Sequence, residues 1–196
     1  MPENRREILK SICRDSFSPF TKETYQATAN GTTYELATDA HILLAIPVSK
    51  SDLPGLPESK HGTQDRIPEW LSRKPEKLIN GGFAGFAFYN FLNLNECAQC
   101  PVCKGSGKRA LDFDADNGII DPFGEERYVR IDGHDINANK LVRMLAQLPI
   151  APAKPLGYRR DVGGNPNDTT AAQHTFYGEG WTLILMGCRE DSAGKD

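Results

Sequence analysis

Ala37-Thr38-Asp39-Ala40-His41-Ile42-Leu43-Leu44 marks the point where a predicted strand closes on a short polar turn. Upstream, Thr24 to Thr28 and Thr32 to Leu36 are strand-like runs on either side of Asn30-Gly31. Asn-Gly between two such runs is a strong hairpin signal. The second run is expected to continue through Ile42 to Ile46. The stretch therefore lies among antiparallel strands.

A helix is predicted ahead of these strands, over Arg5 to Arg14. Its apolar side chains recur at helical spacing and define one buried face: Ile8, Leu9, Ile12 and Cys13. The basic residues Arg6, Lys10 and Arg14 recur every fourth position on another face. The first unit is thus a helix followed by strands.

The C-terminal part repeats that order without repeating the residues. A strand is predicted over Tyr128 to Ile131, and a helix over Ile136 to Leu148 carries Lys140 and Arg143 on one face. Three further strands are predicted over Leu156 to Arg160, His174 to Tyr177 and Trp181 to Met186, the last two joined by a turn at residues 178–180. The fold class is therefore α+β.

The 37–44 stretch resembles the Thr-Asp-Gly-His-Arg-Leu signature that closes a strand in the bacterial sliding clamp, the ring-shaped processivity subunit of the replicative DNA polymerase. The C-terminal order of a helix, Pro155-Leu156 and a last strand is similar to the end of a clamp domain. In its Met-Pro-Met-Arg motif, Met186 and Arg189 match, while Gly187 and Cys188 depart from it. The resemblance covers two separate blocks of the chain.

It implies a DNA-clamp-like domain with two helices on one side of an antiparallel sheet. We expect residues 1–48 to form the first clamp-like half and 127–196 the second, with 49–126 as an insertion. Ser49 to Pro68 is rich in Pro, Ser, Gly and charge and predicts a loop, whereas Phe83 to Leu94 predicts a strand. The insertion is expected to be separable from the two flanking blocks.

Composition narrows the class of protein. A chain of 196 residues with 39% hydrophobic and 25% charged residues is typical of a soluble globular protein. No apolar run is long enough to span a bilayer, and the charged start from Met1 to Lys10 has no signal-peptide core. We therefore expect a cytoplasmic protein without a membrane partner. The net charge of -3 leaves any affinity for DNA to local basic patches.

The cysteine cluster is the clearest chemical signal. Cys97, Cys100 and Cys103 form two overlapping C-x-x-C steps, and Cys100 to Gly107 resembles one zinc-knuckle repeat of J-domain chaperones. We predict one structural zinc, which orders the insertion. The fourth ligand stays open among His61, His134, Cys188 and Cys13. An iron–sulfur site and unliganded thiols are the alternatives.

The basic helix faces carry the functional prediction. In sliding clamps, helices line the channel and present Lys and Arg to the DNA backbone. The matching candidates in this chain are Arg5, Arg6, Lys10, Arg14, Lys140 and Arg143. Such residues suit sequence-independent phosphate contact, although Lys and Arg also occupy ordinary exposed helix faces.

Two functions remain from different classes. The first is a non-enzymatic sliding-clamp-like protein that contacts DNA or the replication machinery, encoded by a phage or other mobile element. A single domain would have to form a homo-oligomer or bind another clamp to encircle DNA. The second is a phage-type inhibitor that uses the clamp-like fold and its zinc module to bind a host protein. A zinc enzyme would need a catalytic constellation, and the sequence contains none that we recognise.

Overall fold

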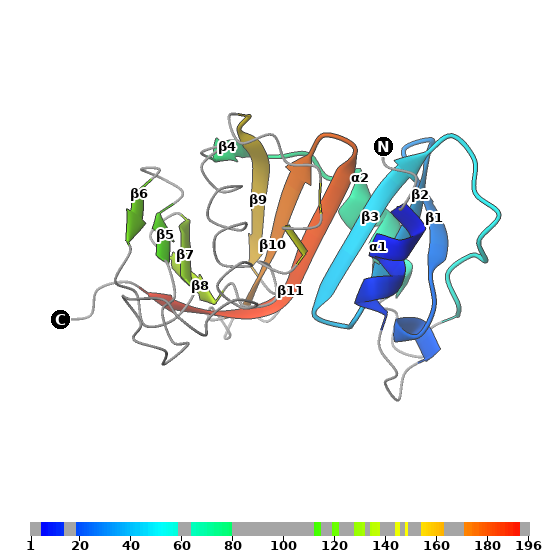
Figure 1. Cartoon of the computed structure of the whole chain (residues 1–196), viewed down its shortest axis with the longest axis horizontal. Coiled ribbons are helices and arrows are strands. Elements are labelled where there is room, and N and C mark those ends of the chain that lie inside the picture. Colours follow the sequence, from blue (N-terminus) through cyan, green and yellow to red (C-terminus); the bar gives the residue numbers. More distant parts are fainter. Residues whose placement is uncertain are drawn as a thin grey trace, which may run out of the picture. The chain divides into compact units, whose positions relative to one another are not determined.

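The fold is described from a computed structural model of the chain (Figure 1). It describes residues 5–13, 19–58, 64–79, 112–114, 119–121, 128–131, 134–137, 144–145, 148, 154–162 and 171–192. The chain divides into two compact units. The first comprises Met1–Glu76, Tyr158–Arg160 and His174–Met186, and the second comprises Lys77–Gly157, Asp161–Gln173 and Gly187–Asp196. The first unit thus extends past the boundary at residue 48 that the sequence predicts.

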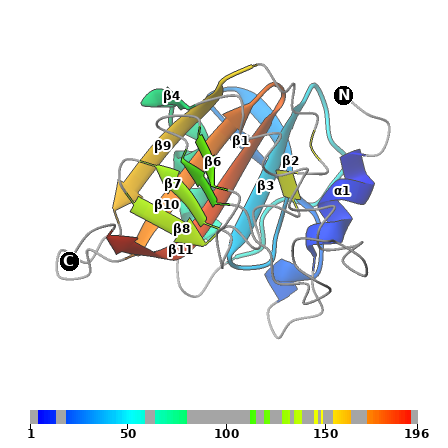
Figure 2. The ribbon, with the colours of Figure 1, turned by 60° about the vertical axis from the view of Figure 1, so that its left-hand side comes forward.

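The sheet of the first unit draws its strands from both ends of the chain. Its N-terminal strands are β1 (Tyr25–Ala29), β2 (Thr32–Thr38) and β3 (Ile42–Val48). Antiparallel to β3 runs β11 (Trp181–Ser192), with Ala45 opposite Thr182. Next to β11 come β10 (Ala171–Gly178) and β9 (Leu156–Val162) (Figure 2). The short strand β4 (Lys77–Ile79) belongs to the second unit. The predicted sheet built from both halves is confirmed.

The β1–β2 hairpin forms where the sequence predicts it. Ala29 pairs with Thr32 across a two-residue turn, in which Asn30 has φ 49° and Gly31 φ 74°. These positive values match the turn type whose twist fits that of the flanking strands. Asn-Gly therefore sets the register that buries Tyr25, Ala27 and Ala29 on one face.

Two helices cover opposite faces of this sheet. The predicted N-terminal helix is confirmed as α1 (Arg5–Ile12), which buries Ile8, Leu9 and Ile12 and packs on β2 and β3. A second helix, α2 (Ile67–Ser72), follows a 3-10 turn at Gln64–Arg66 and packs on β1. Successive residues of a strand point to opposite faces. Leu36 packs with α2 while the neighbouring Glu35 binds α1, so the helices lie on opposite faces. The expected arrangement of two helices on one side of the sheet is therefore not found for α1 and α2. For the other predicted helix, over Ile136 to Leu148, it stays a prediction.

The α2 helix belongs to the core, although it lies inside the predicted insertion. Ile67, Trp70 and Leu71 are buried against a cluster from four strands: Tyr25, Ala27, Ala29, Leu36, Leu43, Ala45 and Ile184. A short 3-10 turn at Pro19–Thr21 brings Phe20 to the edge of the same cluster. The predicted loop over Ser49 to Pro68 therefore holds only for its first part, because helical turns begin at Gln64.

The described part of the second unit consists mainly of short strands. β5 (Asp112–Asp114) pairs antiparallel with β6 (Ile119–Asp121) and parallel with β7 (Tyr128–Ile131). β7 pairs antiparallel with β8 (His134–Asn137), which also pairs with Glu190 to Ser192 of β11. The predicted strand over Tyr128 to Ile131 is confirmed.

The predicted helix start at Ile136 is wrong. Ile136 lies in β8, opposite Val129. In the sequence, Asp132-Gly133 is a hairpin signal between two strand-like runs. The pairing of β8 with β7 therefore places strand structure at the start of the expected helix. Met144 and Leu145 are helical and buried, as is Leu148 in the turn that follows. Asn137 is the last residue of β8. The other residues of that predicted helix, and the predicted strand over Phe83 to Leu94, lie outside the described residues.

A tight polar turn separates β2 from β3, where the sequence predicts one continuing run. The Asp39 Oδ1 atom accepts hydrogen bonds from the backbone N–H groups of His41 and Ile42, at 2.9 and 2.8 Å. The Thr38 hydroxyl donates to the Ile42 carbonyl at 2.7 Å and accepts from the Ala40 N–H at 3.1 Å. These side chains replace the ladder bonds that the turn interrupts, so the chain reverses and β3 runs back along β2.

Ala40 occupies a backbone conformation that favours glycine, with φ 74°. A residue with a Cβ atom is strained in this conformation by about 1–2 kcal/mol. Glycine avoids that strain, but the greater conformational entropy of its unfolded chain lowers the unfolding free energy by roughly 0.4–1 kcal/mol. We expect Ala40→Gly to raise the unfolding free energy by about 0.5–1 kcal/mol, measured by urea denaturation. Ala37→Gly is the matched control, because Ala37 is buried in the strand β2. This variant should have an unfolding free energy lower by about 1 kcal/mol. Equal losses in both variants would contradict the strain at Ala40.

Candidate functional site

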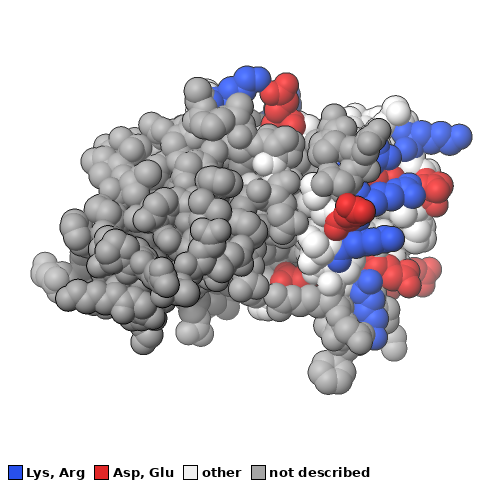
Figure 3. Space-filling model, in the orientation of Figure 1, with Lys and Arg blue, Asp and Glu red and all other residues white. Residues whose placement is uncertain are grey.

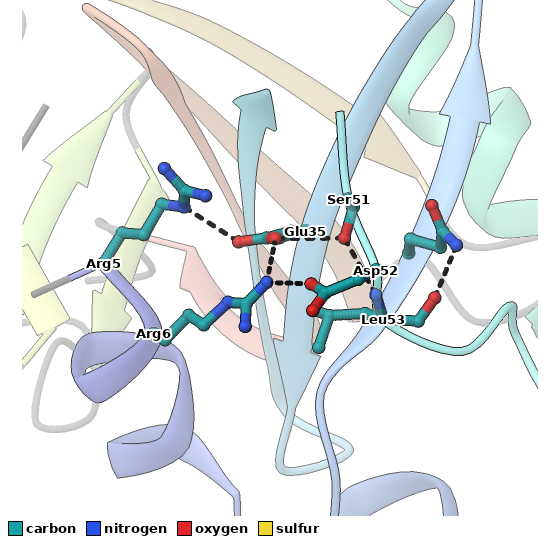
Figure 4. Close-up of polar contacts among 7 residues, drawn as sticks. Arg5, Arg6, Glu35, Ser51, Asp52 and Leu53 are labelled. Atoms are coloured by element: carbon teal, nitrogen blue, oxygen red, sulfur yellow. Dashed lines mark hydrogen bonds and ion pairs between the residues drawn. The ribbon is translucent and has the colours of Figure 1, made fainter. Parts of the chain in front are cut away.

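A buried carboxylate on β2 gathers two arginines of α1 (Figure 4). The side chain of Glu35 is fully buried. Its Oε2 accepts a hydrogen bond from Arg5 Nε at 2.9 Å, and its Oε1 accepts one from Arg6 Nη2 at 3.1 Å. The Ser51 hydroxyl donates to the same Oε1 at 3.0 Å. Three donors from two segments therefore converge on one carboxylate, as a buried charge requires.

Asp52 adds a second carboxylate on the solvent side. Arg6 Nη2 also donates to Asp52 Oδ1, so one guanidinium nitrogen bridges the buried and the exposed acid. Asp52 is held in a small turn, in which the Leu53 N–H donates to the Ser51 hydroxyl at 3.2 Å. The side chain of Asp52 is 80% exposed, against 43% for Arg6 and 38% for Arg5. The cluster is therefore closed towards the sheet and open towards solvent.

The network lowers the pKa values of both acids. For Glu35, burial acts to raise the pKa, but hydrogen bonds from Arg5, Arg6 and Ser51 outweigh it, and the net pKa is lowered. For Asp52, the hydrogen bond from Arg6 is the main cause of the lowered pKa. Conversely, Asp52 and then Glu35 raise the pKa of the Arg6 guanidinium. The cluster at neutral pH therefore holds two cations and two anions.

The lowered pKa of Glu35 predicts an acid-sensitive contribution to stability. A carboxyl group whose pKa is lower in the folded state stabilises the fold at pH values above its unfolded pKa, which is about 4.3 for Glu. This contribution is lost as the pH falls through the folded-state pKa. Wild type should exceed Glu35→Gln by about 2 kcal/mol in unfolding free energy above that pH. The difference should shrink as the pH is lowered further, followed by urea denaturation across the acid range. A difference that does not depend on pH would contradict this assignment.

A second buried polar pair lies in the core of the first unit. The Tyr158 hydroxyl and His174 Nδ1 are 2.6 Å apart, and the two residues are 1% and 0% exposed. Their rings stack, and Phe176 packs against Tyr158. Because this pair is sealed from solvent, we assign it to the packing of β9 on β10.

The predicted DNA-contacting residues are only partly described. Arg5, Arg6 and Lys10 all lie on α1, and Lys10 is exposed. Arg14, Lys140 and Arg143 lie outside the described residues. Figure 3 shows basic and acidic side chains interspersed over the described part of this face, without one continuous basic patch. Arg6, for example, is paired with both Glu35 and Asp52.

The predicted zinc ligands Cys97, Cys100 and Cys103 also lie outside the described residues. Within the part that is described, no group of three metal-ligating side chains occurs. Of the four candidates for the fourth ligand, Cys13 is the one whose side chain is described. It is a free thiol with Sγ 3.7 Å from the Leu9 carbonyl, and burial raises its pKa. Structural zinc stays a prediction.

Sequence reasoning missed Glu35 and its partners. The available signal was a charged residue inside the apolar run Tyr34 to Ala37, where a buried position needs a cation. Periodicity alone placed Arg6 on a polar face of the helix. It could not show that this face meets β2, because that contact joins residues far apart in the sequence.

Comparisons with protein-family models, curated proteins and solved structures give no match to this chain. Among the described residues, no helix is both long and apolar enough to cross a membrane.

Proposed function

We propose that this protein is a non-enzymatic, sliding-clamp-like protein that contacts DNA through the side of its first unit that carries α1. One observation carries the proposal: α1 presents Arg5 and Arg6 with their guanidinium groups fixed by one buried carboxylate. A fixed guanidinium loses little further freedom when it binds a phosphate. Lys10, exposed on the same helix, adds a third cation.

The turn between β2 and β3 supports the resemblance on which this proposal draws. Ala40 stands where the clamp signature has glycine, and its φ of 74° is a glycine-favouring value. Thr38 and Asp39, two of the residues that match the signature, make the hydrogen bonds that hold the turn. As in a clamp, self-association into a homo-oligomer would be needed to encircle DNA. Structural zinc in the segment around Cys97 to Cys103 belongs to the same proposal.

Lys10→Glu tests the DNA-contact function without touching the Glu35 network. Because phosphate contacts carry no base information, binding to labelled duplexes of unrelated sequence should weaken uniformly, by about three- to tenfold at low salt. Lys74→Glu is the matched control, since Lys74 is exposed just after α2, the helix on the other face of the sheet. Anisotropy titrations would measure the affinities, and light scattering the oligomeric mass. Equal affinities for wild type and Lys10→Glu would remove α1 from the interface.

The second candidate is a phage-type inhibitor that binds a host protein. The alternation of basic and acidic side chains over the described face favours it, because such a surface suits a protein partner of mixed charge (Figure 3). A monomer or dimer indifferent to DNA that captures one defined protein from a bacterial lysate would support this candidate over the first.

A further inference from the structure

We propose that Arg5 and Arg6 form a two-armed phosphate site in which Asp52 occupies the place of the phosphate on Arg6 until DNA displaces it. This inference rests on the proposed DNA-contact function and adds a self-inhibiting contact to it. Glu35 acts as a positioning residue, since it holds both arginines from the buried side.

The two arginines have donors to spare. Arg5 binds Glu35 through Nε, and Arg6 binds both acids through Nη2. Within the described part of the chain, Arg5 Nη1 and Nη2 and Arg6 Nε and Nη1 make no hydrogen bond. Figure 4 shows Arg5 reaching Glu35 through Nε, with neither terminal nitrogen on the dashed line. A guanidinium offers five N–H donors in a planar fork that suits phosphate oxygens, so each arginine can hold Glu35 and a phosphate together.

The two carboxylates differ in how easily a phosphate can replace them. Glu35 is fully buried and accepts three hydrogen bonds, so displacing it would leave a buried charge without partners. Asp52 is 80% exposed, and an exposed ion pair contributes little to stability because water screens it. Asp52 is therefore the exchangeable ligand of Arg6, and its removal should expose one more cation to DNA.

Asp52→Asn removes this competitor with little change in shape. Affinity for a labelled duplex should rise about two- to fivefold at low salt, which is the worth of an exposed ion pair. The slope of log affinity against log salt should become steeper by up to about 0.9, corresponding to one additional phosphate neutralised. The gain should disappear in an Arg6→Gln background, because Asp52 acts through Arg6.

Two charge-matched variants separate this proposal from a simple effect of net charge. Glu35→Gln also removes one negative charge, yet it should weaken binding, because the arginines lose the buried group that aims them. Glu69→Gln removes one negative charge from an exposed pair with Arg73 on α2, the helix on the other face of the sheet. Compared at 0.1 M salt, where exposed charges are largely screened beyond about 10 Å, it should leave the affinity within about 1.5-fold of wild type. Circular dichroism would check that Glu35→Gln is folded. If it is not, Asp52→Asn alone and in the Arg6→Gln background still tests the role of Asp52.

The outcomes distinguish the two proposals. If wild type binds DNA and Asp52→Asn changes the affinity no more than Glu69→Gln does, the role of Asp52 is overturned. The DNA-contact function is then unaffected. A gain from Asp52→Asn that persists in the Arg6→Gln background would also overturn it. No binding by any variant, even at low salt, would overturn both proposals together.

Discussion

Replacing Trp70 with Ala is expected to lower the unfolding free energy by about 3–5 kcal/mol, the usual cost of emptying a buried Trp site. Trp70 is 8% exposed and packs among residues of β1, β2, β3 and β11. The Arg66 guanidinium lies 5.8 Å from the centre of its ring on the outer side. Urea denaturation followed by far-ultraviolet circular dichroism would measure the change.

Glu69→Ala is the matched control for this prediction. Glu69 lies on the exposed side of the same helix and pairs with Arg73, so its loss should cost no more than about 0.5 kcal/mol. Equal effects in the two variants would show that α2 does not pack as described. A large effect of Trp70→Ala alone would show that the segment after residue 48 completes the first unit. A deletion that spares this unit should then begin after Glu76.

Gly178→Ala is expected to destabilise the first unit by about 3 kcal/mol, at the upper end of overpacking effects. A Cβ atom built at Gly178 would overlap the indole ring of Trp181, which follows across the β10–β11 turn. That ring is 2% exposed and cannot swing away without disturbing the core. Thermal denaturation of the variant should show the loss as a lowered midpoint.

Gly55→Ala provides the comparison for Gly178. Gly55 has open space around its Cα, so the added methyl should be neutral or slightly stabilising. The emission of Trp181 adds a local readout, because the chain has only two tryptophans and Trp70 can be replaced separately. An unshifted midpoint in Gly178→Ala would mean that the turn repacks around the methyl group at little cost.

Local signals in the sequence predicted a large part of the fold. The 3.6-residue spacing of Ile8, Leu9 and Ile12 gave α1, and Asn30-Gly31 gave the first hairpin. The apolar runs before and after residues 178–180 gave β10 and β11. Each of these signals acts between near neighbours in the chain.

The errors have a common physical cause. The six-residue α2 is too short to show a periodic pattern, and its stability comes from tertiary burial of Trp70. Ile136 fits a helical pattern and a strand equally well, and its pairing partner Val129 decided between them. The Glu35 network depends on α1 meeting β2, which no local pattern encodes.

The pairing of β3 with β11 also bears on how the chain is made in the cell. Ala45 is synthesised long before Thr182, its partner across the sheet. Until residues 182–185 leave the ribosome, Ile42 to Ala45 present an unpaired apolar edge to the surrounding medium. Pairing between such distant residues slows folding, because the entropy cost of closing a long loop comes before the stabilising contacts form. We therefore expect the nascent chain to be prone to aggregation until β11 has been synthesised.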